Sequence, residues 1–289
     1  MRIALLGVGA MHSRMAKNLI RAGFDLALYN RTSEACADLT ALGAKAYATP
    51  CLAVEQADVV IAMVTDNDAA RAVWLAPETG AVHGLSPRHI AIESSTLGVD
   101  CCQALAAAIQ PTGAQFIDAP VMGSLPHAEQ RQLIYLAGGN PQAIAQVQPV
   151  LQVNAKTVLH VGEQGAGMKL KLVANTLFAL QLAAMAELMG VLQQTGLPLT
   201  QVAPLLEQLP VTSPVMTAAL HLMRKGQFAP LFPVDLVVKD LGYMAQYAAD
   251  AAAPAPLAEQ TAAVFQQAQF EGLGWENITS VMKLYLESR

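Results

Sequence analysis

The chain has 289 residues, of which 54% are hydrophobic and only 13% are charged, and its net charge is −5 at pH 7. This length allows one large domain or two ordinary domains with a substantial core. The negative charge and the lack of a basic tract argue against nucleic acid as a partner. The four cysteines lack CxxC or zinc-type spacing, which predicts reduced side chains, no metal site and a cytoplasmic protein.

Two apolar stretches have the composition of membrane or targeting segments. The N-terminal run is short and is soon followed by Arg14 and Lys17, which favours a buried first strand over a signal peptide. The stretch at 172–190 contains Asn175 and Glu187, so we expect a buried helix rather than a membrane span. The sequence therefore predicts no contact with a membrane.

The first half of the chain alternates short apolar runs with helical patterns. Strands are expected at 2–7, 25–30, 58–64, 89–95, 114–120, 132–139 and 157–162, with helices at 11–22, 33–41, 67–75 and 99–109. Apolar strands that alternate with helices are typical of a parallel sheet covered on both faces. The predicted fold class is therefore α/β, with a Rossmann-type, doubly wound parallel sheet.

Strand signals end after Gly162. One long helix is expected from 165 to about 194, followed by shorter helices that break at glycine and proline positions. We therefore expect a dinucleotide-binding domain at 1–161 and an all-helical substrate and dimerisation domain at 162–289. The active site is expected in the cleft between them. The apolar helical half favours a homodimer or homotetramer, although a large internal core would explain the same composition.

The first expected strand is followed by a glycine loop that opens a helix. Gly7 and Gly9 allow a tight turn and the close approach of a pyrophosphate, whose charge the helix N-terminus favours. His12 replaces the third glycine of the G-x-G-x-x-G pattern, and we interpret it either as a tolerated side chain or as a phosphate contact. Dinucleotide binding is expected for the whole loop: Gly7, Val8, Gly9, Ala10 and Met11.

The end of the second expected strand indicates which dinucleotide binds. NAD sites usually carry an acidic residue there, whereas this chain has Asn30, Arg31 and Thr32. An arginine pairs with a 2′-phosphate that an acid would repel. We therefore predict NADP(H) as the cofactor, with these three residues around the phosphate. The alternative is that Arg31 is a solvated surface residue.

Four further stretches narrow the function: ESSTLGVD at 93–100, DAPVMGS at 118–124, GEQGAGMKLKLVANT at 162–176 and FPVDLVVKDLGYM at 232–244. With the glycine loop, they resemble the β-hydroxyacid dehydrogenase family over essentially the whole chain. That family includes 3-hydroxyisobutyrate dehydrogenases and tartronate, glyoxylate and succinic semialdehyde reductases. The resemblance implies an NADP-dependent oxidoreductase that transfers a hydride between the nicotinamide and a small carbonyl or hydroxy acid, of the semialdehyde acid or glyoxylate type.

The resemblance implies that Lys171 is the catalytic proton donor, with Asn175 beside it, and that both contact the substrate. The two residues are four positions apart, so their side chains share one helix face. A lysine ammonium can stabilise the alkoxide that hydride transfer leaves and can donate a proton to it. Lys169 is the competing lysine, but it lacks an asparagine four residues later.

The other motifs imply further contacts. Phe232 would help to close the substrate pocket. Contacts with the cofactor are implied for Met63, Val64, Thr65, Ser95, Thr96 and Lys239. Helix capping is an alternative role for Ser95 and Thr96.

The substrate motif departs from the family pattern D-A-P-V-S-G, whose serine and following glycines bind the substrate carboxylate. Met122 replaces that serine, which makes the pocket more apolar. Gly123 and Ser124 can still hold an anion through their backbone N–H groups, and Ser124 can supply the missing hydroxyl. The usual 3-hydroxy acid substrate is therefore in question, whereas the reaction type is not.

Two other functions stay open on the sequence. Imine reductases share the fold and the glycine loop, and Met122 mildly favours a substrate without a carboxylate, but Lys171 argues against them. A non-catalytic cofactor-binding module would be free to lose Lys171 and Asn175. Metal or covalent catalysis lacks support, because the histidines show no ligand spacing and no nucleophile has a histidine partner in a motif.

Overall fold

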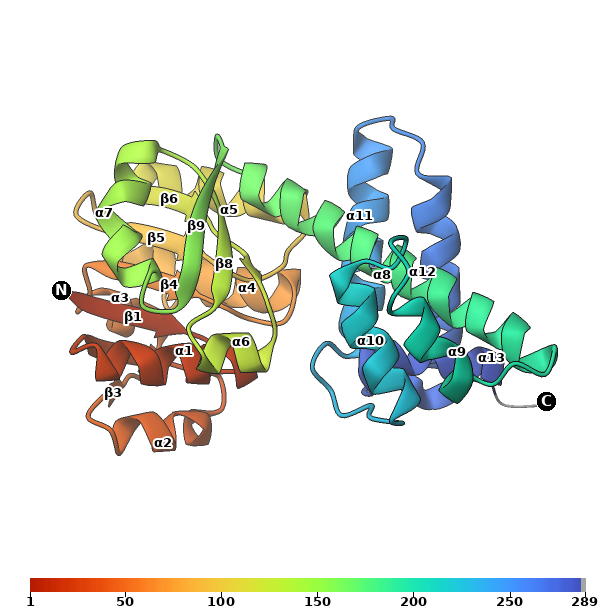
Figure 1. Ribbon diagram of the computed structural model, residues 1–289. Helices are drawn as coiled ribbons and strands as arrows, with labels where there is room; N and C mark the ends of the chain where they lie inside the picture. Colours follow the sequence, from red (N-terminus) through yellow and green to blue (C-terminus); the bar gives the residue numbers. More distant parts are fainter. Residues whose placement is uncertain (287–289) are drawn as a thin grey trace. The chain divides into compact units, whose positions relative to one another are not determined.

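The computed structural model of the protein describes residues 1–286. The chain divides into two compact units, Met1–Lys171 and Leu172–Arg289, which Figure 1 colours from red to green and from green to blue. The division falls inside a long helix rather than at 161/162, where the expected strands end. It lies later because the first turn of this helix packs on the first unit, where Met168 joins a buried cluster.

A nine-stranded sheet forms the centre of the first unit. Its strands are β1 (Arg2–Leu6), β2 (Asp25–Tyr29), β3 (Lys45–Ala46), β4 (Val59–Ala62), β5 (Ile90–Glu93), β6 (Gln115–Asp118), β7 (Val121–Met122), β8 (Leu133–Gly138) and β9 (Ala155–Gly162). They follow the order β3-β2-β1-β4-β5-β6-β8-β7, and β9 pairs with β8. Neighbours from β3 to β6 are parallel, in the order typical of a dinucleotide-binding sheet. The predicted doubly wound α/β fold is confirmed.

The far edge of the sheet differs from the prediction of a purely parallel sheet. There β8 runs antiparallel to β6 and β7, while β9 runs parallel to β8. An antiparallel edge strand is common in otherwise parallel sheets. The sequence patterns did not indicate β3 or β7, because two residues are too short to show a period.

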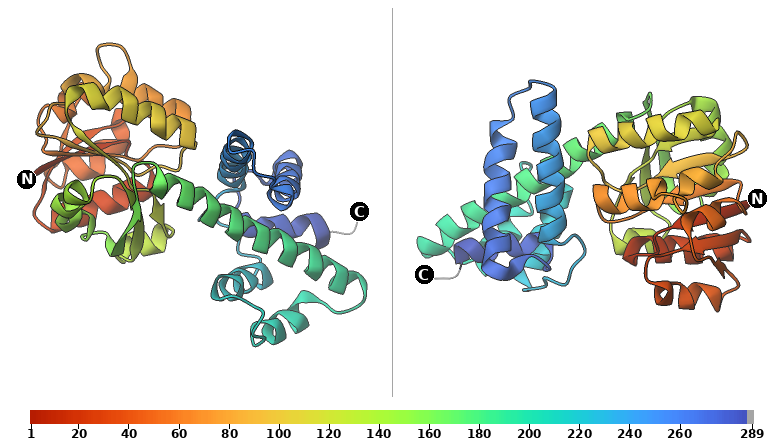
Figure 2. Two further views of the ribbon diagram at one scale, coloured as in Figure 1. Left: turned by 90° about the horizontal axis from the view of Figure 1, so that it is seen from above. Right: turned by 180° about the vertical axis from the view of Figure 1, so that it is seen from behind.

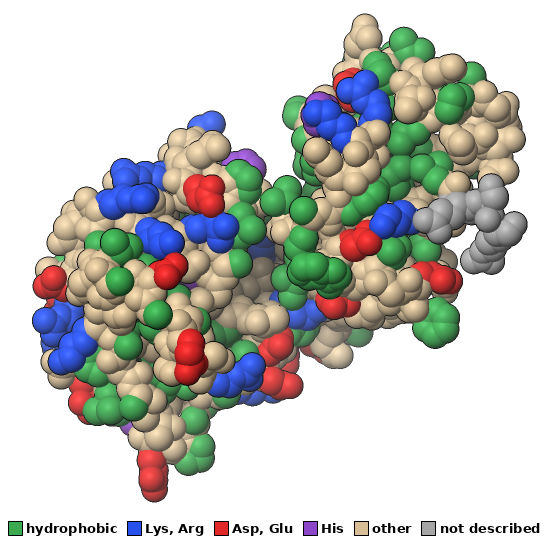
Figure 3. Space-filling view, turned by 90° about the horizontal axis from the view of Figure 1, so that it is seen from below, with side chains coloured by type: hydrophobic (Ala, Val, Ile, Leu, Met, Phe, Trp, Pro, Cys, Tyr) green, Lys and Arg blue, Asp and Glu red, His purple; other side chains and the backbone are tan. Residues whose placement is uncertain are grey.

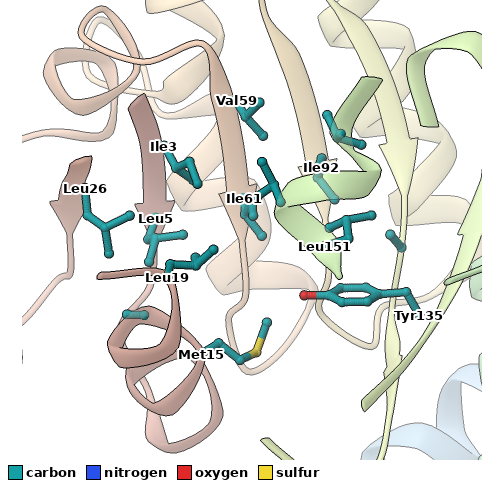
Figure 4. Close-up of a cluster of buried hydrophobic side chains, with 14 of the residues drawn as sticks. Ile3, Leu5, Met15, Leu19, Leu26, Val59, Ile61, Ile92, Tyr135 and Leu151 are labelled. Atoms are coloured by element: carbon teal, nitrogen blue, oxygen red, sulfur yellow. The ribbon is translucent and has the colours of Figure 1, made fainter. Parts of the chain in front are cut away.

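Helices cover both faces of this sheet, as the two views of Figure 2 show. They are α1 (Ala10–Arg21), α2 (Ala37–Thr40), α3 (Pro50–Val54), α4 (Asn67–Leu75), α5 (Val99–Ile109), α6 (Leu125–Glu129) and α7 (Pro141–Leu151). Side chains alternate along each strand, so Ile3 and Leu5 pack in one cluster with α1, α2, α6 and α7. Figure 4 shows the part of this cluster that involves α1 and α7. Ala4 and Leu6 pack with α3, α4 and α5 on the other face.

Three short 3₁₀ turns complete the first unit, at Ser33–Cys36, Ala81–Gly84 and Gln110–Thr112. The helix expected at 33–41 is therefore divided into a 3₁₀ turn and α2. The helices expected at 67–75 and 99–109 match α4 and α5 in both bounds.

The second unit is helical. It contains α8 (Ala166–Gln194, from Leu172 on), α9 (Leu199–Leu206), α10 (Pro214–Arg224), α11 (Val234–Asp250), α12 (Pro256–Ala268) and α13 (Lys283–Leu286), with a π-helical turn at Gln269–Leu273 and a 3₁₀ turn at Ile278–Met282. Its core gathers around Phe265, Leu182 and Leu220. Figure 1 shows α11 and α12 side by side.

Within residues 1–286, α8 is the one helix that is long and apolar enough to span a membrane. Length and composition alone are weak evidence, because core helices of soluble proteins share them. Ala179, Leu182 and Ala186 of α8 belong to the core of the helical unit. This position is that of a buried core helix, as the sequence predicts.

Candidate cofactor and substrate site

The glycine loop between β1 and α1 has the geometry that a dinucleotide needs. Gly7 has a φ of +85°, and a Cβ atom there would lie 2.5 Å from the carbonyl oxygen of Met63, so the position requires glycine. Apart from Gly9 and its neighbours in the chain, none of the described residues has an atom within 4 Å of a Cβ placed on Gly9. Within residues 1–286, no side chain caps the N-terminus of α1 after Gly9. Its first N–H groups are therefore suited to a pyrophosphate.

Asn30 connects the end of β2 to this loop. Its Oδ1 atom accepts a hydrogen bond of 2.8 Å from the backbone N–H of Val8, and its Nδ2 atom donates to the carbonyl oxygen of Thr32 at 2.8 Å. Arg31 and Thr32 follow and are exposed. The structure thus brings the two predicted cofactor segments together, although it uses the Asn30 side chain to hold the loop. The contact of Arg31 with a 2′-phosphate stays a prediction.

His12, the departure from the glycine pattern, lies beneath the loop. Its side chain is 1% exposed, and its Nδ1 atom lies 2.6 Å from the carbonyl oxygen of Gly7. Because a carbonyl oxygen only accepts, Nδ1 carries the proton and donates it. Burial lowers the pKa of His12 to about 4, against a weaker opposing effect of the hydrogen bond to Gly7. The structure therefore favours a neutral side chain that supports the loop over the phosphate contact considered from the sequence.

A buried carboxylate lies at the carboxyl end of β5, on the same side of the sheet as the glycine loop. Glu93 ends β5 and is fully buried, and it accepts hydrogen bonds of 2.8 Å from the indole Nε1 of Trp74 and from the backbone N–H of Ser95. Burial raises its pKa, while these bonds act in the opposite direction. Sequence reasoning gave Glu93 no role. An acidic residue at the end of a strand that is apolar on both faces was the available signal.

Ser95 connects Glu93 to the predicted cofactor segment at 63–65. Its Oγ atom accepts a hydrogen bond of 2.8 Å from the backbone N–H of Val64, between the half-buried Met63 and the exposed Thr65. The helix-capping alternative for Ser95 and Thr96 is wrong, because α5 begins after Gly98.

The predicted substrate motif lies on β7 and the turn that follows it. Gly123 has a φ of +125°, and a Cβ atom there would lie 2.8 Å from Cδ2 of Leu133, so glycine is required. Ser124 is the N-cap residue of α6, and its hydroxyl oxygen lies 3.1 Å from Nδ1 of His127. The hydroxyl expected to replace the missing serine is thus already engaged in the first turn of α6. Its backbone N–H also points to the same His127 nitrogen, at 3.2 Å.

Lys171 comes from the first turns of α8 and meets this motif directly. Its Nζ atom lies 3.5 Å from the sulfur of Met122, and the residue as a whole is only 7% exposed. The residue that replaces the family serine therefore touches the predicted proton donor. A polarisable thioether in this place offers the amine a weak acceptor and an apolar wall.

The second unit holds the remaining predicted residues. Asn175 donates a hydrogen bond of 2.6 Å from Nδ2 to Oδ2 of Asp240, which is buried. The other carboxylate oxygen of Asp240 lies 3.0 Å from Nζ of Lys239, which also lies 5.0 Å from the ring centroid of Tyr243. The sequence motif contains this K-D pair, but it does not predict the hydrogen bond by which Asp240 orients Asn175. Its signal was the acid that follows the predicted lysine.

Phe232 is half-buried just before α11, where its backbone N–H donates to Oδ1 of Asn277 at 3.0 Å. The contacts predicted for Phe232 with the substrate and for Lys239 with the cofactor stay predictions. Each unit therefore contributes an ordered polar group of its own: the sheet edge with Lys171 in the first, and the Asn175–Asp240–Lys239 group in the second.

Two protein-family models match the chain. The NAD binding domain of 6-phosphogluconate dehydrogenase matches residues 2–162, and the NAD-binding domain of NADP-dependent 3-hydroxyisobutyrate dehydrogenase matches residues 165–285. Together they account for nearly all of the described chain.

Curated relatives and solved structures agree with these matches. The chain is 31% identical to glyoxylate/succinic semialdehyde reductase 2 of Arabidopsis thaliana, over 97% of this chain and 78% of that protein. It is 30% identical to the mitochondrial 3-hydroxyisobutyrate dehydrogenase of Drosophila melanogaster, over 98% of this chain and 88% of that protein. A crystal structure of 3-hydroxyisobutyrate dehydrogenase from Salmonella typhimurium superposes with a TM-score of 0.87 and 28% identity, over 99% and 100% of the two chains.

These matches cover the chain from the glycine loop to the last helices, and the motifs that carry the resemblance occupy ordered positions in the structure. The chain belongs to the β-hydroxyacid dehydrogenase family and is an NAD(P)-dependent oxidoreductase.

Proposed function

We propose that this protein is an NADP-dependent reductase of small aldehyde acids, of the semialdehyde or glyoxylate type, with Lys171 as the proton donor. The observation that carries the proposal is the nearly buried amine of Lys171, which lies against Met122 of the substrate motif. The two relatives named above are a glyoxylate/succinic semialdehyde reductase and a 3-hydroxyisobutyrate dehydrogenase. Both names describe the interconversion of a small carbonyl and a hydroxy acid.

The residues of this chain supply proton transfer and orientation. When bound, the reduced nicotinamide supplies the hydride to the carbonyl carbon. Lys171 holds a proton at Nζ, where an ammonium stabilises the charge that develops on the carbonyl oxygen and then donates the proton to it. Because a carboxylate only accepts, the amide nitrogen of Asn175 must face Asp240. Its Oδ1 atom is thereby left to accept from an ammonium or a substrate hydroxyl.

Met122 narrows the expected substrate. Because both the hydroxyl and the backbone N–H of Ser124 are directed at His127, we assign a substrate carboxylate to the backbone N–H of Gly123. A short aldehyde acid with an apolar segment next to its carbonyl fits this combination best. Imine reduction is the second candidate, because the same methionine suits a substrate without a carboxylate. An imine reductase from a Pseudomonas species shares the fold at 20% identity, with a TM-score of 0.63.

The first experiment is oxidation of NADPH and NADH by the purified protein with aldehyde acids, neutral aldehydes and cyclic imines. We expect turnover of NADPH with aldehyde acids, and Lys171→Ala should lower kcat on the order of 100- to 10,000-fold because the general acid is lost. Lys169→Ala is the matched control and should keep wild-type turnover. Turnover with imines alone would show that the protein is an imine reductase and not a carbonyl reductase. Full activity of Lys171→Ala would show that Lys171 is not the proton donor.

The choice of NADP(H) rests on Arg31, at the exposed end of β2 next to Asn30. Arg31→Ala should weaken NADPH binding roughly 10- to 100-fold, since a hydrogen-bonded charge pair with the 2′-phosphate is lost. NADH binding should not change. Fluorescence titration measures both affinities, and Arg21→Ala, at the other end of α1, removes an equal charge as a control. A wild-type preference for NADH would overturn this assignment.

We also propose that the protein is cytoplasmic and assembles as a homodimer or homotetramer through its helical unit. Support for assembly comes from apolar side chains of α8 that stay exposed in the single chain: Val173, Leu177, Leu188 and Val191. They follow helical spacing, so they form one stripe. On the face that Figure 3 shows, hydrophobic side chains form patches over the helical unit, while acidic and basic side chains are interspersed over the α/β unit. Exposed apolar patches of this kind are typical of protein interfaces.

A further inference from the structure

Asp118, the last residue of β6, binds the first turn of α8. Its carboxylate is fully buried. Oδ1 accepts a hydrogen bond of 2.6 Å from the backbone N–H of Gly165, and Oδ2 accepts one of 2.8 Å from Met168. A side chain nearly fifty residues earlier in the sequence therefore satisfies helix N–H groups that a local cap would otherwise satisfy. Its negative charge also suits the N-terminal end of the helix dipole.

The backbone around this carboxylate is shaped to admit it. A Cβ atom on Gly138 would lie 2.6 Å from Oδ1 of Asp118, and one on Gly167 would lie 2.8 Å from the backbone oxygen of Asp118. A Cβ on Gly167 would also collide with the carbonyl oxygen of Leu136. Glycine at both positions is thus what brings α8 within hydrogen-bond distance of β6.

The same two segments touch again four residues after Asp118 and three after Met168. There the Nζ atom of Lys171 lies 3.5 Å from the sulfur of Met122. The sulfur of Met168, in turn, accepts a hydrogen bond of 3.2 Å from the backbone N–H of Leu97, next to the Ser95–Thr96 segment. The first turn of α8 is therefore held by Asp118 at the end of β6 and by Leu97, after β5, and Lys171 follows Met168 by three residues, about one helical turn.

We propose that Asp118 is the positioning residue for Lys171, because its two hydrogen bonds set where the first turn of α8, and hence the lysine amine, stands relative to Met122. The inference rests on the proposed role of Lys171. Asp118 would act in this way without touching the substrate or the cofactor.

The pKa of Asp118 makes its hydrogen bonds to the first turn of α8 depend on pH. Burial raises its pKa from 3.8 to about 6, although the N–H groups of Gly165 and Met168 act in the opposite direction. A raised carboxyl pKa means that the group stabilises the fold at low pH and that this contribution is lost as the pH rises through 6. Protonation below about pH 6 therefore removes one of the two acceptors that hold the first turn of α8. Titratable groups in the neighbourhood of Asp118 include Glu93, its register partner on β5, and Cys102 on α5, which also interacts with Lys169 of α8.

The test compares Asp118→Asn with Asn140→Ala in the full-length protein. Asparagine keeps the volume of Asp118 and one acceptor, but places an NH₂ group against the second N–H group. Asn140 is the matched control, because its Oδ1 caps α7 by accepting from Gln142 and Ala143 in the same unit. Stopped-flow measurement of NADPH oxidation with an aldehyde acid gives the rate of hydride transfer, and a fluorescence titration gives cofactor affinity.

We expect Asp118→Asn to lower the hydride-transfer rate on the order of 100-fold, since small misplacements of a catalytic group have effects of this size. Its NADPH affinity should stay within about twofold. Asn140→Ala should lower the unfolding temperature but keep the rate. The wild-type rate should fall as the pH drops from 7 to 5, whereas the rate of Asp118→Asn should stay flat across this interval.

A rate for Asp118→Asn within twofold of wild type would overturn the proposal. If the variant does not fold, a wild-type rate independent of pH between 5 and 7 would overturn it equally. A second measurement needs no substrate. The rate of reductive methylation of Lys171 is followed by mass spectrometry in the wild type and in both variants, with Lys169 as the reference. This labelling should speed up in Asp118→Asn and not in Asn140→Ala. If no carbonyl is turned over at all, the proposed function fails, and the labelling alone still decides whether Asp118 positions Lys171.

Discussion

His12 stands where a third glycine usually lets the helix lie close to the first strand. The structure shows how a histidine fits: the ring is buried and donates from Nδ1 to the carbonyl oxygen of Gly7. It stays neutral because burial lowers its pKa to about 4. The side chain therefore acts on the cofactor loop through the backbone, and it makes the stability of the fold depend on pH.

We expect His12→Asn to reduce the acid sensitivity of the protein. The ordinary pKa of histidine is 6.5, so the stabilisation from neutral His12 is present above pH 6.5 and is lost as the pH falls towards 4. From pH 7 to pH 5 this loss is about 2 kcal/mol of unfolding free energy. Asparagine keeps an N–H donor but does not titrate. Urea denaturation at both pH values measures the effect as a difference between the two proteins, in which the opposite contribution of Asp118 cancels.

His83→Asn changes an exposed histidine and serves as the control, because it should leave the wild-type pH dependence in place. An equal loss of stability in wild type and in His12→Asn on acidification would contradict a neutral buried ring at position 12.

The helix α8 shows what an element takes from local sequence and what it takes from its neighbours. Gly165 and Gly196 have φ values of +88° and +89° and bracket the helix, so the bounds expected from the glycines were nearly those observed. The hydrogen bonds from Gly165 and Met168 to Asp118 were not predictable in this way. They join residues that are close only once β6 and α8 are both in place.

Other elements went unpredicted although a local signal existed. Asn140 caps α7 with its Oδ1 atom, and Pro141 occupies the first helical position, which is the usual start of a helix. Pro149 inside α7 obscured the pattern, because proline normally ends a helix. The helix tolerates it within a buried face that includes Ile144 and Val147.

Each of the two units has its own hydrophobic core, which is why the chain divides as it does. The helical unit buries Phe265 and Leu182 but leaves the stripe of α8 with Leu177 and Leu188 exposed. A single chain therefore does not satisfy all of its apolar surface, and the proposed assembly would cover it.

We expect the purified protein to be a dimer or tetramer at micromolar concentration, and Leu177→Glu with Leu188→Glu to dissociate it, because a buried unpaired charge is costly. Light scattering coupled to size-exclusion chromatography measures the mass. Leu257→Glu, at an exposed leucine of α12, should leave the assembly intact. A monomeric wild type would show that the α8 stripe has another purpose.

The sequence by itself determined the fold class, the positions of the main strands along the chain and the family, because apolar periodicity and short motifs are local properties of the chain. It also indicated Gly7, because a tight turn requires that residue type, and it pointed to Lys171 and Met122 through the motifs that resemble the family. Only the tertiary structure decided that Asn30 holds the glycine loop, that His12 supports it, that the Ser124 hydroxyl is already engaged and that Asp118 binds the turn before Lys171. Asn30 and Asp118 act through hydrogen bonds to residues far along the chain, and His12 and Ser124 through contacts within a few residues. In both cases a linear pattern holds no record of which donor will meet which acceptor.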